Sequence, residues 1–240
     1  MKLSVCIATY NGALHIKTQV DSILKQLGTH DQVVIVDDAS TDSTVSILNG
    51  CKDPRIEIYR NKSNIGAALT FNKALHLAQG QLIFLSDQDD CWDENKVRII
   101  KDIFLKQDVD LIIHDARVVS CEHIVYPSLF MHHGSGPGIF KNILSNTYTG
   151  CCMAFKKDVL KKVLPISPRI GLFHDAWIGI LSEFFNFRTI FIKEKLIDFN
   201  RHGFNASSMR RRPILLIIRD RMYFMSALIW HIIKYKFSWK

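Results

Sequence analysis

Three carboxylates follow a short apolar segment in the first half of the chain. Leu82–Leu85 predicts a buried strand, and the next five residues include Asp87, Asp89 and Asp90. Like charges at a sheet edge repel one another and lose hydration, which destabilises the fold unless a cation neutralises them. Divalent ions such as Mg²⁺ prefer oxygen ligands and are often shared between carboxylates and substrate phosphates. The cluster indicates metal-assisted chemistry on a phosphorylated substrate, with a solvated acidic turn as the alternative.

Two other predicted strands also end in polar residues. Leu3–Ala8 leads into Thr9-Tyr10, and Val33–Val36 leads into Asp37-Asp38. In parallel sheets, ligands bind beyond the carboxyl ends of the strands. We therefore expect the polar residues of all three strand ends to meet at one edge of a sheet.

The elements that must position these residues alternate along residues 1–110. Apolar residues at helical spacing fill Ile16–Leu27 and Phe71–Ala78, with Gly28 and Gly80 where helices are expected to end. Strands alternating with helices predict βαβ units, hence an α/β fold whose mixed, mostly parallel sheet is flanked by helices.

The second half of the chain is less regular and shows neither a repeat nor a dividing linker. Gly134–Gly138 predicts a loop. The loop is either a mobile cover for a substrate or an ordinary surface loop. The remaining predictions are strands at Cys151–Phe155, Thr189–Ile192 and Leu196–Asn200, and helices at Val159–Leu164 and Ala176–Phe185.

Composition restricts the class of protein. The chain has 240 residues, 48% hydrophobic and 22% charged, as expected for a globular protein with a buried core. Its six cysteines form no Cys-x-x-Cys pair, and the apolar run after Lys2 is too short for a signal peptide. Free thiols in a cytoplasmic protein are the simplest interpretation.

The positive charge is concentrated in residues 209–240. This tail holds eight basic residues and one acid, Asp220, which gives +7 of the +8 net charge. A nucleic-acid-binding protein would carry its positive charge more widely. The uncharged run Met222–Ile233 is too short to span a membrane, and its aromatic and basic neighbours favour an amphipathic helix on an anionic membrane surface. A helix packed on the core is the alternative.

In this order of motifs the chain resembles the family 2 glycosyltransferases, which have the GT-A fold. The matching segments are Ser4–Gly12, Val34–Asp42, Asn64–Gly66 with Asn72, Ser86–Asp90, Thr149–Cys152, His174–Trp177 and Arg201–Gly203. The chain looks most similar to the bacterial branch that builds O-antigen or capsule units, including rhamnosyl-, glucosyl- and galactosyltransferases. The resemblance implies a catalytic domain over residues 1–208, with a nucleotide-binding half (1–110) and an acceptor-binding half (111–208).

The resemblance also implies roles for individual residues. Tyr10 would stack on a pyrimidine and Asp38 would accept its imide N–H, with Thr9 and Asn64 contributing to the same nucleotide-sugar site. Asp87 would hold the ribose and, together with Asp89 and His202, a divalent metal, Mg²⁺ or Mn²⁺. Asp90 would lie next to these ligands without binding the substrate or the metal itself. For His202, the alternative is a surface histidine with no role in the site.

The general base implied by the resemblance is Asp175. Inverting transfer requires a carboxylate that removes the acceptor proton. The family usually has Glu-Asp at this point, whereas this chain has His174-Asp175. His174 would tune a pKa or simply pack, and the alternative for Asp175 is a helix N-cap.

These inferences together predict an inverting hexosyl- or deoxyhexosyltransferase. Its donor would be a UDP- or dTDP-sugar, its acceptor a saccharide on a polyprenyl diphosphate, and its location the cytoplasmic face of the inner membrane. A non-catalytic nucleotide-sugar-binding module is the first alternative. A sugar nucleotidyltransferase is less favoured, because the loop after the first strand offers only Gly12 and no Lys or Arg before Lys17.

Overall fold

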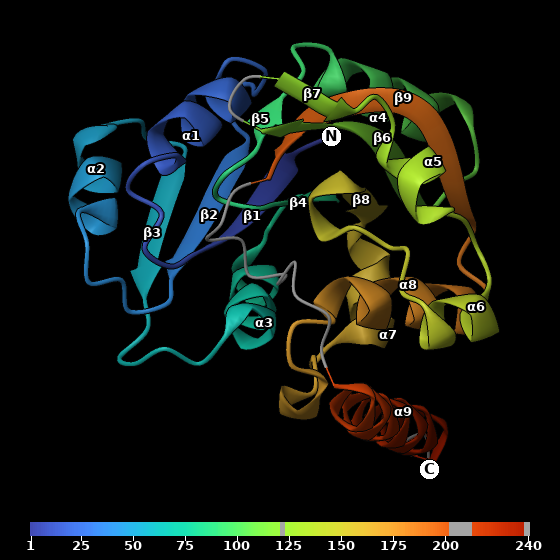
Figure 1. The fold of residues 1–240 in the computed structure, drawn as a ribbon. Coiled ribbons are helices and arrows are strands. Elements are labelled where there is room, and N and C mark those ends of the chain that lie inside the picture. Colours follow the sequence, from blue (N-terminus) through green and yellow to red (C-terminus); the bar gives the residue numbers. More distant parts are fainter. Residues whose placement is uncertain (121–122, 202–212, 238–240) are drawn as a thin grey trace.

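The computed structural model describes residues 1–120, 123–201 and 213–237. Within these residues one nine-stranded sheet runs through the molecule in the order β3-β2-β1-β4-β8-β6-β9-β5, with β7 paired to β6 (Figure 1). The two predicted halves therefore share one continuous sheet, and the α/β prediction of a mixed sheet flanked by helices is confirmed.

The first half of the sheet is parallel. Its strands are β1 (Leu3–Thr9), β2 (Gln32–Asp37), β3 (Ile56–Arg60) and β4 (Leu82–Ser86), and β1 lies between β2 and β4. The three central strands are almost wholly buried, as expected for parallel strands covered on both faces. Thr9 pairs with Asp37, so the polar strand ends lie side by side as predicted.

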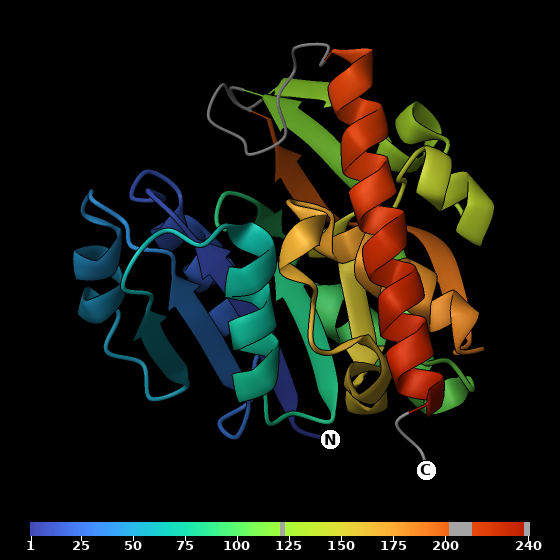
Figure 2. The same cartoon turned by 90° about the horizontal axis from the view of Figure 1, so that it is seen from below.

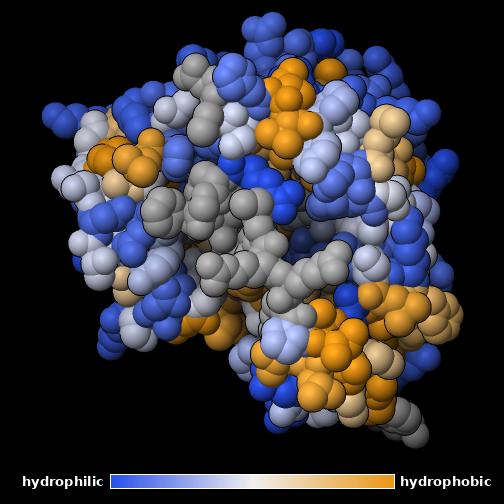
Figure 3. Space-filling view, in the orientation of Figure 1, coloured by the Kyte–Doolittle hydropathy of each residue, from blue (hydrophilic) through white to orange (hydrophobic). Residues whose placement is uncertain are grey.

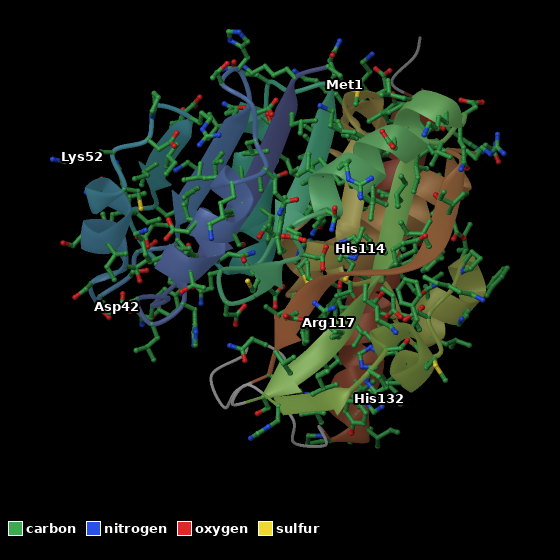
Figure 4. All side chains as sticks on the ribbon, turned by 90° about the horizontal axis from the view of Figure 1, so that it is seen from above. Met1, Asp42, Lys52, His114, Arg117 and His132 are labelled. Carbon is green, nitrogen blue, oxygen red and sulfur yellow. The ribbon has the colours of Figure 1, made fainter. Side chains whose placement is uncertain are left out.

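Helices cover the two faces of this half. They are α1 (Ile16–Leu24), α2 (Thr44–Gly50), α3 (Ala67–Leu77) and α4 (Lys96–Lys106). Seen from below, α3 lies in front of the strands (Figure 2), and seen from above, α1 and α4 do (Figure 4). The turn after α3 brings Gly80 directly against β1. A Cβ at this position would lie 2.4 Å from the Ser4 backbone nitrogen, so a larger residue would not fit.

The second half of the sheet is mostly antiparallel. It contains β5 (Cys91–Trp92), β6 (Leu111–Ser120), β7 (His123–Tyr126), β8 (Met153–Lys156) and β9 (Thr189–Asn200). The prediction of two strands over residues 189–200 is wrong, because β9 is continuous and pairs in parallel with β6. The strand predicted at Cys151 begins at Met153 instead, after the 3₁₀ turn η1 (Gly150–Cys152).

Short helices complete this half of the molecule. They are α5 (Leu129–His133), α6 (Ile139–Leu144), η2 (Lys157–Val159), α7 (Leu160–Val163), η3 (Pro168–Ile170) and α8 (His174–Phe184). The predicted glycine loop links α5 to α6. A hydrogen bond connects this loop to α8, because the Glu183 carboxylate accepts the Gly138 N–H at 3.0 Å. The same carboxylate also accepts a hydrogen bond from the Tyr148 hydroxyl at 2.6 Å.

The last described helix, α9 (Ile214–Phe237), packs one face on the domain and exposes the other. Phe224, Ala227 and Leu228 are buried, and Phe224 meets Trp177 of α8 edge to face at 6.3 Å. Figure 2 shows α9 lying across the helices of the second half. None of the helices in the described ranges combines the length and the apolar character that a bilayer-crossing segment needs.

The outward face of α9 is apolar as well. Figure 3 shows an orange patch over this helix. The exposed apolar residues are Ile214, Leu215, Leu216, Ile218, Met222, Tyr223, Met225, Ile229, Trp230 and Ile233. The alternative that the tail helix packs on the core thus holds for one face of α9, and the other face is exposed. The basic residues 210–212 lie outside the described residues.

Candidate active site

A cavity of about 550 Å³ opens where β1 and β4 end, bounded on its far side by the start of α8. It is lined by every predicted site residue that the structure describes: Thr9, Tyr10, Asp38, Asn64, Asp87, Asp89 and Asp175. His202 lies outside the described residues. Among these predicted residues, Thr9 and Asp175 are the farthest apart in the sequence, 166 positions, yet they line one cavity.

Gln88 ties the first strand end to the acidic loop. Its Oε1 accepts hydrogen bonds from the Thr9 hydroxyl at 2.6 Å and the Tyr10 N–H at 2.9 Å, and its Nε2 donates to the Tyr10 carbonyl. Gly12 makes room for this contact, since a Cβ there would lie 2.4 Å from the Gln88 oxygen. Gln88 therefore fixes the backbone of Tyr10 relative to the acidic loop, while Tyr10 as a residue is 44% exposed and borders the cavity.

Asp38 is held by a ring of N–H donors at one end of the cavity. Its Oδ1 accepts hydrogen bonds from the Asn61 amide and the Ile65 N–H, both at 2.9 Å, and its Oδ2 accepts one from the Gly66 N–H at 2.8 Å. Gly66 adopts φ +87°, a conformation that glycine reaches without strain. Asn64 borders the cavity on this same loop. The result is a fixed carboxylate beside an exposed aromatic ring, suited to the flat, polar-edged face of a base.

The carboxylates of the acidic loop after β4 repel one another. Burial, followed by the charge of Asp89, raises the pKa of Asp87 to about 6. Burial, followed by the charges of Asp87 and Asp89, raises the pKa of Asp90 well above its usual range. A divalent cation would relieve this repulsion, and the oxygen donors of Asp87 and Asp89 fit Mg²⁺ or Mn²⁺.

Asp175 lies beside these carboxylates at the start of α8. The N-cap interpretation is wrong, because Phe173 occupies that position and Asp175 is inside the helix. Its Oδ1 accepts hydrogen bonds from the Ala176 N–H at 2.7 Å and the Asn146 amide at 3.1 Å. Burial raises the pKa of Asp175 to about 6, a value suited to a base that works near neutral pH.

His174 is packed behind Asp175. Its ring stacks on Phe71 with 4.3 Å between ring centroids, and its Nδ1–H donates to the Leu172 carbonyl at 3.1 Å. Burial lowers the pKa of His174, so the ring is neutral. Its Nε2 is buried next to Gly150, and no residue in the described part of the chain supplies a hydrogen bond to it.

The sequence did not reveal several residues of this cavity. Asn146, which donates a hydrogen bond to Asp175, stands in a loop without a recognisable pattern, and His133 and Phe199 also line the cavity. Figure 4 labels His132, the neighbour of His133 at the end of α5. No sequence signal could have found Asn146, because the fold alone brings it to Asp175.

The comparisons with known proteins agree with this geometry. The sequence profile of glycosyl transferase family 2 matches residues 4–164, more than half of the chain. The chain belongs to glycosyl transferase family 2. The match includes Thr9, Tyr10, Asp38, Asn64, Asp87 and Asp89 and ends before Asp175. The resemblance inferred from the motifs is therefore confirmed, whereas the roles of individual residues stay predictions.

Two curated relatives illustrate the similarity. An uncharacterized glycosyltransferase from Nostoc is 26% identical over 217 residues, which cover 85% of this chain and 66% of the relative. The Escherichia coli protein WfaP, named as a UDP-Glc:α-D-GlcNAc-diphosphoundecaprenol β-1,3-glucosyltransferase, is 40% identical over 95 residues, 40% of this chain and 38% of WfaP. The matches span less than two thirds of either relative.

Solved structures share the GT-A architecture. Staphylococcus aureus TarS in complex with UDP-GlcNAc aligns with a TM-score of 0.72 at 20% identity, covering 88% of this chain and 62% of that one. A Pyrobaculum calidifontis mannosyltransferase in complex with GDP-Man and Mn²⁺ aligns with a TM-score of 0.63 at 20% identity, covering 97% and 63%. At this identity the likeness establishes the fold alone.

Proposed function

We propose that the protein is an inverting glycosyltransferase. It moves a hexose or deoxyhexose from a UDP- or dTDP-sugar to a hydroxyl of a lipid-linked saccharide in surface polysaccharide synthesis. The observation that carries this proposal is that one cavity is lined by Tyr10 and Asp38, by the carboxylates Asp87 and Asp89, and by a further carboxylate, Asp175, at the start of α8. The activity for which WfaP is named, transfer to a diphosphoundecaprenol-linked sugar, supports the acceptor class.

Each group of residues that lines the cavity has its own role in this proposal. Tyr10 stacks on the pyrimidine, and Asp38 accepts the imide N–H that uracil and thymine share. Asp87 and Asp89 would hold Mg²⁺ or Mn²⁺, which would neutralise the negative charge of the departing nucleoside diphosphate. The neighbouring acid Asp90 keeps the loop in place, since its Oδ1 accepts the Asn200 N–H at 3.1 Å at the end of β9.

Asp175 then acts as the general base. An acceptor hydroxyl is a weak nucleophile near neutral pH, so its proton must be removed as the new bond forms. The Asn146 amide fixes the orientation of the Asp175 carboxylate, and the surrounding protein keeps its pKa near the working pH. A single displacement with one base inverts the configuration at the sugar carbon.

The outward face of α9 supports a location at a membrane surface. Its exposed side chains include Trp230 and Tyr223, which favour interfaces between lipid and water, and Arg219, Lys234 and Lys236 stand on the same helix. An apolar face with basic residues fits the anionic cytoplasmic face of the inner membrane, where a polyprenyl-linked acceptor would also lie.

A transfer assay with defined substrates tests the proposal. UDP- and dTDP-sugars are offered with a synthetic GlcNAc-diphospholipid acceptor and Mg²⁺ or Mn²⁺, and the product's anomeric configuration is read by NMR. We expect metal-dependent transfer with inversion from one donor class. Binding of a nucleotide sugar without transfer or hydrolysis would favour a non-catalytic module, and release of diphosphate from a nucleoside triphosphate would favour a nucleotidyltransferase.

A further inference from the structure

We propose that Asp87, Asp90 and Cys151 form a binding site for a thiophilic divalent cation such as Zn²⁺, on the inner side of the cavity. One ligand atom from each residue, two carboxylate oxygens and the Cys151 sulfur, lies within 4.8 Å of the others. An ion with Zn–O of about 2.1 Å and Zn–S of about 2.3 Å holds tetrahedral ligands about 3.6 Å apart. Small side-chain shifts therefore close the site.

A second observation points to a missing ligand at this place. Asp90 is only 4% exposed, and its Oδ1 accepts the Asn200 N–H. Its Oδ2 is buried and has no hydrogen-bond partner among the residues that the structure describes. A buried carboxylate oxygen is expected to have a partner, because leaving it unpaired destabilises the fold. Asp87 lines the cavity, so an ion can reach the three residues from there.

The charges around the site balance when such an ion is bound. The Lys96 side chain is fully buried, donates a hydrogen bond to the Cys151 carbonyl at 2.9 Å and lies 4.1 Å from the centre of the Trp92 ring. The Lys96 ammonium group thus places one positive charge next to the proposed ligands. Two carboxylates and a thiolate are then matched by a divalent ion and this ammonium.

The sulfur ligand decides which ions prefer the site. Thiolates favour Zn²⁺ and Cd²⁺, whereas Mg²⁺ prefers oxygen donors. On binding, the Cys151 S–H bond breaks, a metal–sulfur bond forms and the proton passes to solvent. A bound Zn²⁺ occupies Asp87, which the proposed mechanism needs for the catalytic ion. Zn²⁺ is therefore an inhibitor that competes with Mg²⁺, and this consequence alone rests on the proposed function.

Titration of the full chain with Cd²⁺ tests the site without any substrate. Cadmium–thiolate bonds give an ultraviolet charge-transfer absorption that oxygen ligands do not give. We expect this absorption to saturate in the wild type and to weaken in Cys151→Ser. Because even outer partners of metal ligands contribute 10–100-fold to affinity, loss of the sulfur ligand should weaken binding by roughly tenfold or more. Cys152→Ser is the matched control, a neighbouring thiol that is also fully buried.

Equal Cd²⁺ binding by wild type and Cys151→Ser, or equal loss in both cysteine variants, overturns the proposal. If Cys151→Ser does not fold, Asp90→Asn takes its place and should weaken the same absorption. The transfer assay then separates the two proposals. Zn²⁺ should inhibit wild type and Cys152→Ser in the presence of Mg²⁺. If no variant transfers sugar under any condition, the proposed function fails, while the Cd²⁺ titration still decides the site.

Discussion

Asp175, the proposed general base, lines the same cavity as Asp87 and Asp89. Replacing it by Asn keeps the size and the Oδ1 acceptor for Ala176 and Asn146 but removes the basicity. We expect Asp175→Asn to lower turnover by ~10²–10⁴-fold, with the donor KM nearly unchanged. Steady-state kinetics measure this. Asp102→Asn, an exposed acid on α4 paired with Lys106, is the control and should keep wild-type turnover. A near-normal rate in Asp175→Asn would show that another group is the base.

The pH dependence of turnover should report the same carboxylate. Its pKa of about 6 means that the base is protonated below pH 6, so the rate should fall about tenfold per pH unit there. The hydrogen bond from Asn146 lowers the pKa of Asp175. Asn146→Ala removes this bond, so the acidic limb should move to higher pH. The profile is measured with saturating metal, which keeps Asp87 ionised. An unmoved limb in Asn146→Ala would exclude Asp175 as its source.

Metal dependence is the third prediction for individual residues. Asp87 and Asp89 raise the electrostatic energy of the site unless a cation is present. Excess chelator should abolish transfer, and Asp89→Asn should lose activity while unfolding at the wild-type temperature. Added Mn²⁺ or Mg²⁺ should restore the wild type only. Full turnover in excess chelator would contradict this prediction.

The residues that could be predicted from sequence are those in local patterns. Thr9, Tyr10, Asp38 and Asp87 each follow an apolar strand directly, so strand position alone indicated a shared edge. Asn146 and the partnership of Cys151 with Asp90 could not be predicted. The approach of Cys151 to Asp90 depends on antiparallel pairing of β8 with β4, which joins segments about 70 residues apart and leaves no local signal. The contact of Asn146 with Asp175 joins a loop to α8, and no local pattern marks it either.

The two faces of α9 are expected to have different roles, membrane attachment for the exposed face and packing on the domain for the buried face. Met222 and Trp230 are 66% and 61% exposed, whereas Phe224 is 5% exposed. The double variant Met222→Glu, Trp230→Glu should lose binding to anionic vesicles without a change in unfolding temperature. Phe224→Ala should instead lower the free energy of unfolding by about 3 kcal/mol. High salt should weaken wild-type vesicle binding, because it screens the basic residues.

Vesicle sedimentation and thermal unfolding measure the two effects. Unchanged vesicle binding by the double glutamate variant would exclude the outward face of α9 as the attachment surface. A large stability loss in that variant would mean that this face contacts protein instead.

The elements differ in how far sequence could predict them. β1, β2 and β4 are continuous apolar runs and were predicted directly. β9 was split in the prediction because Lys193, Glu194 and Lys195 interrupt its apolar pattern. These residues are exposed, and the strand continues through them with register shifts against β6. Backbone pairing with a distant strand thus overrides the local pattern.

At the scale of the whole molecule, the shared sheet makes the two halves one folding unit. β4 pairs with β1 on one side and with β8 on the other, so a fragment of residues 1–110 would expose one edge of a buried strand. We expect this fragment not to unfold cooperatively and to self-associate, because unpaired apolar edges promote association. Circular dichroism during urea titration and size-exclusion chromatography check this. A monomeric fragment with a cooperative transition would show two independent domains.

The contact between α9 and α8 has a consequence for how the enzyme meets its acceptor. Phe224 of α9 meets Phe173, which caps the helix that carries Asp175, with 6.0 Å between ring centroids. The helix proposed to lie on the membrane therefore packs directly against the start of the helix that carries the proposed base. On a membrane, the base would stay at a constant height above the lipid headgroups while the protein diffuses laterally. The encounter with a lipid-linked acceptor then becomes a two-dimensional search, and its rate follows the surface density of the acceptor rather than its concentration in bulk solution.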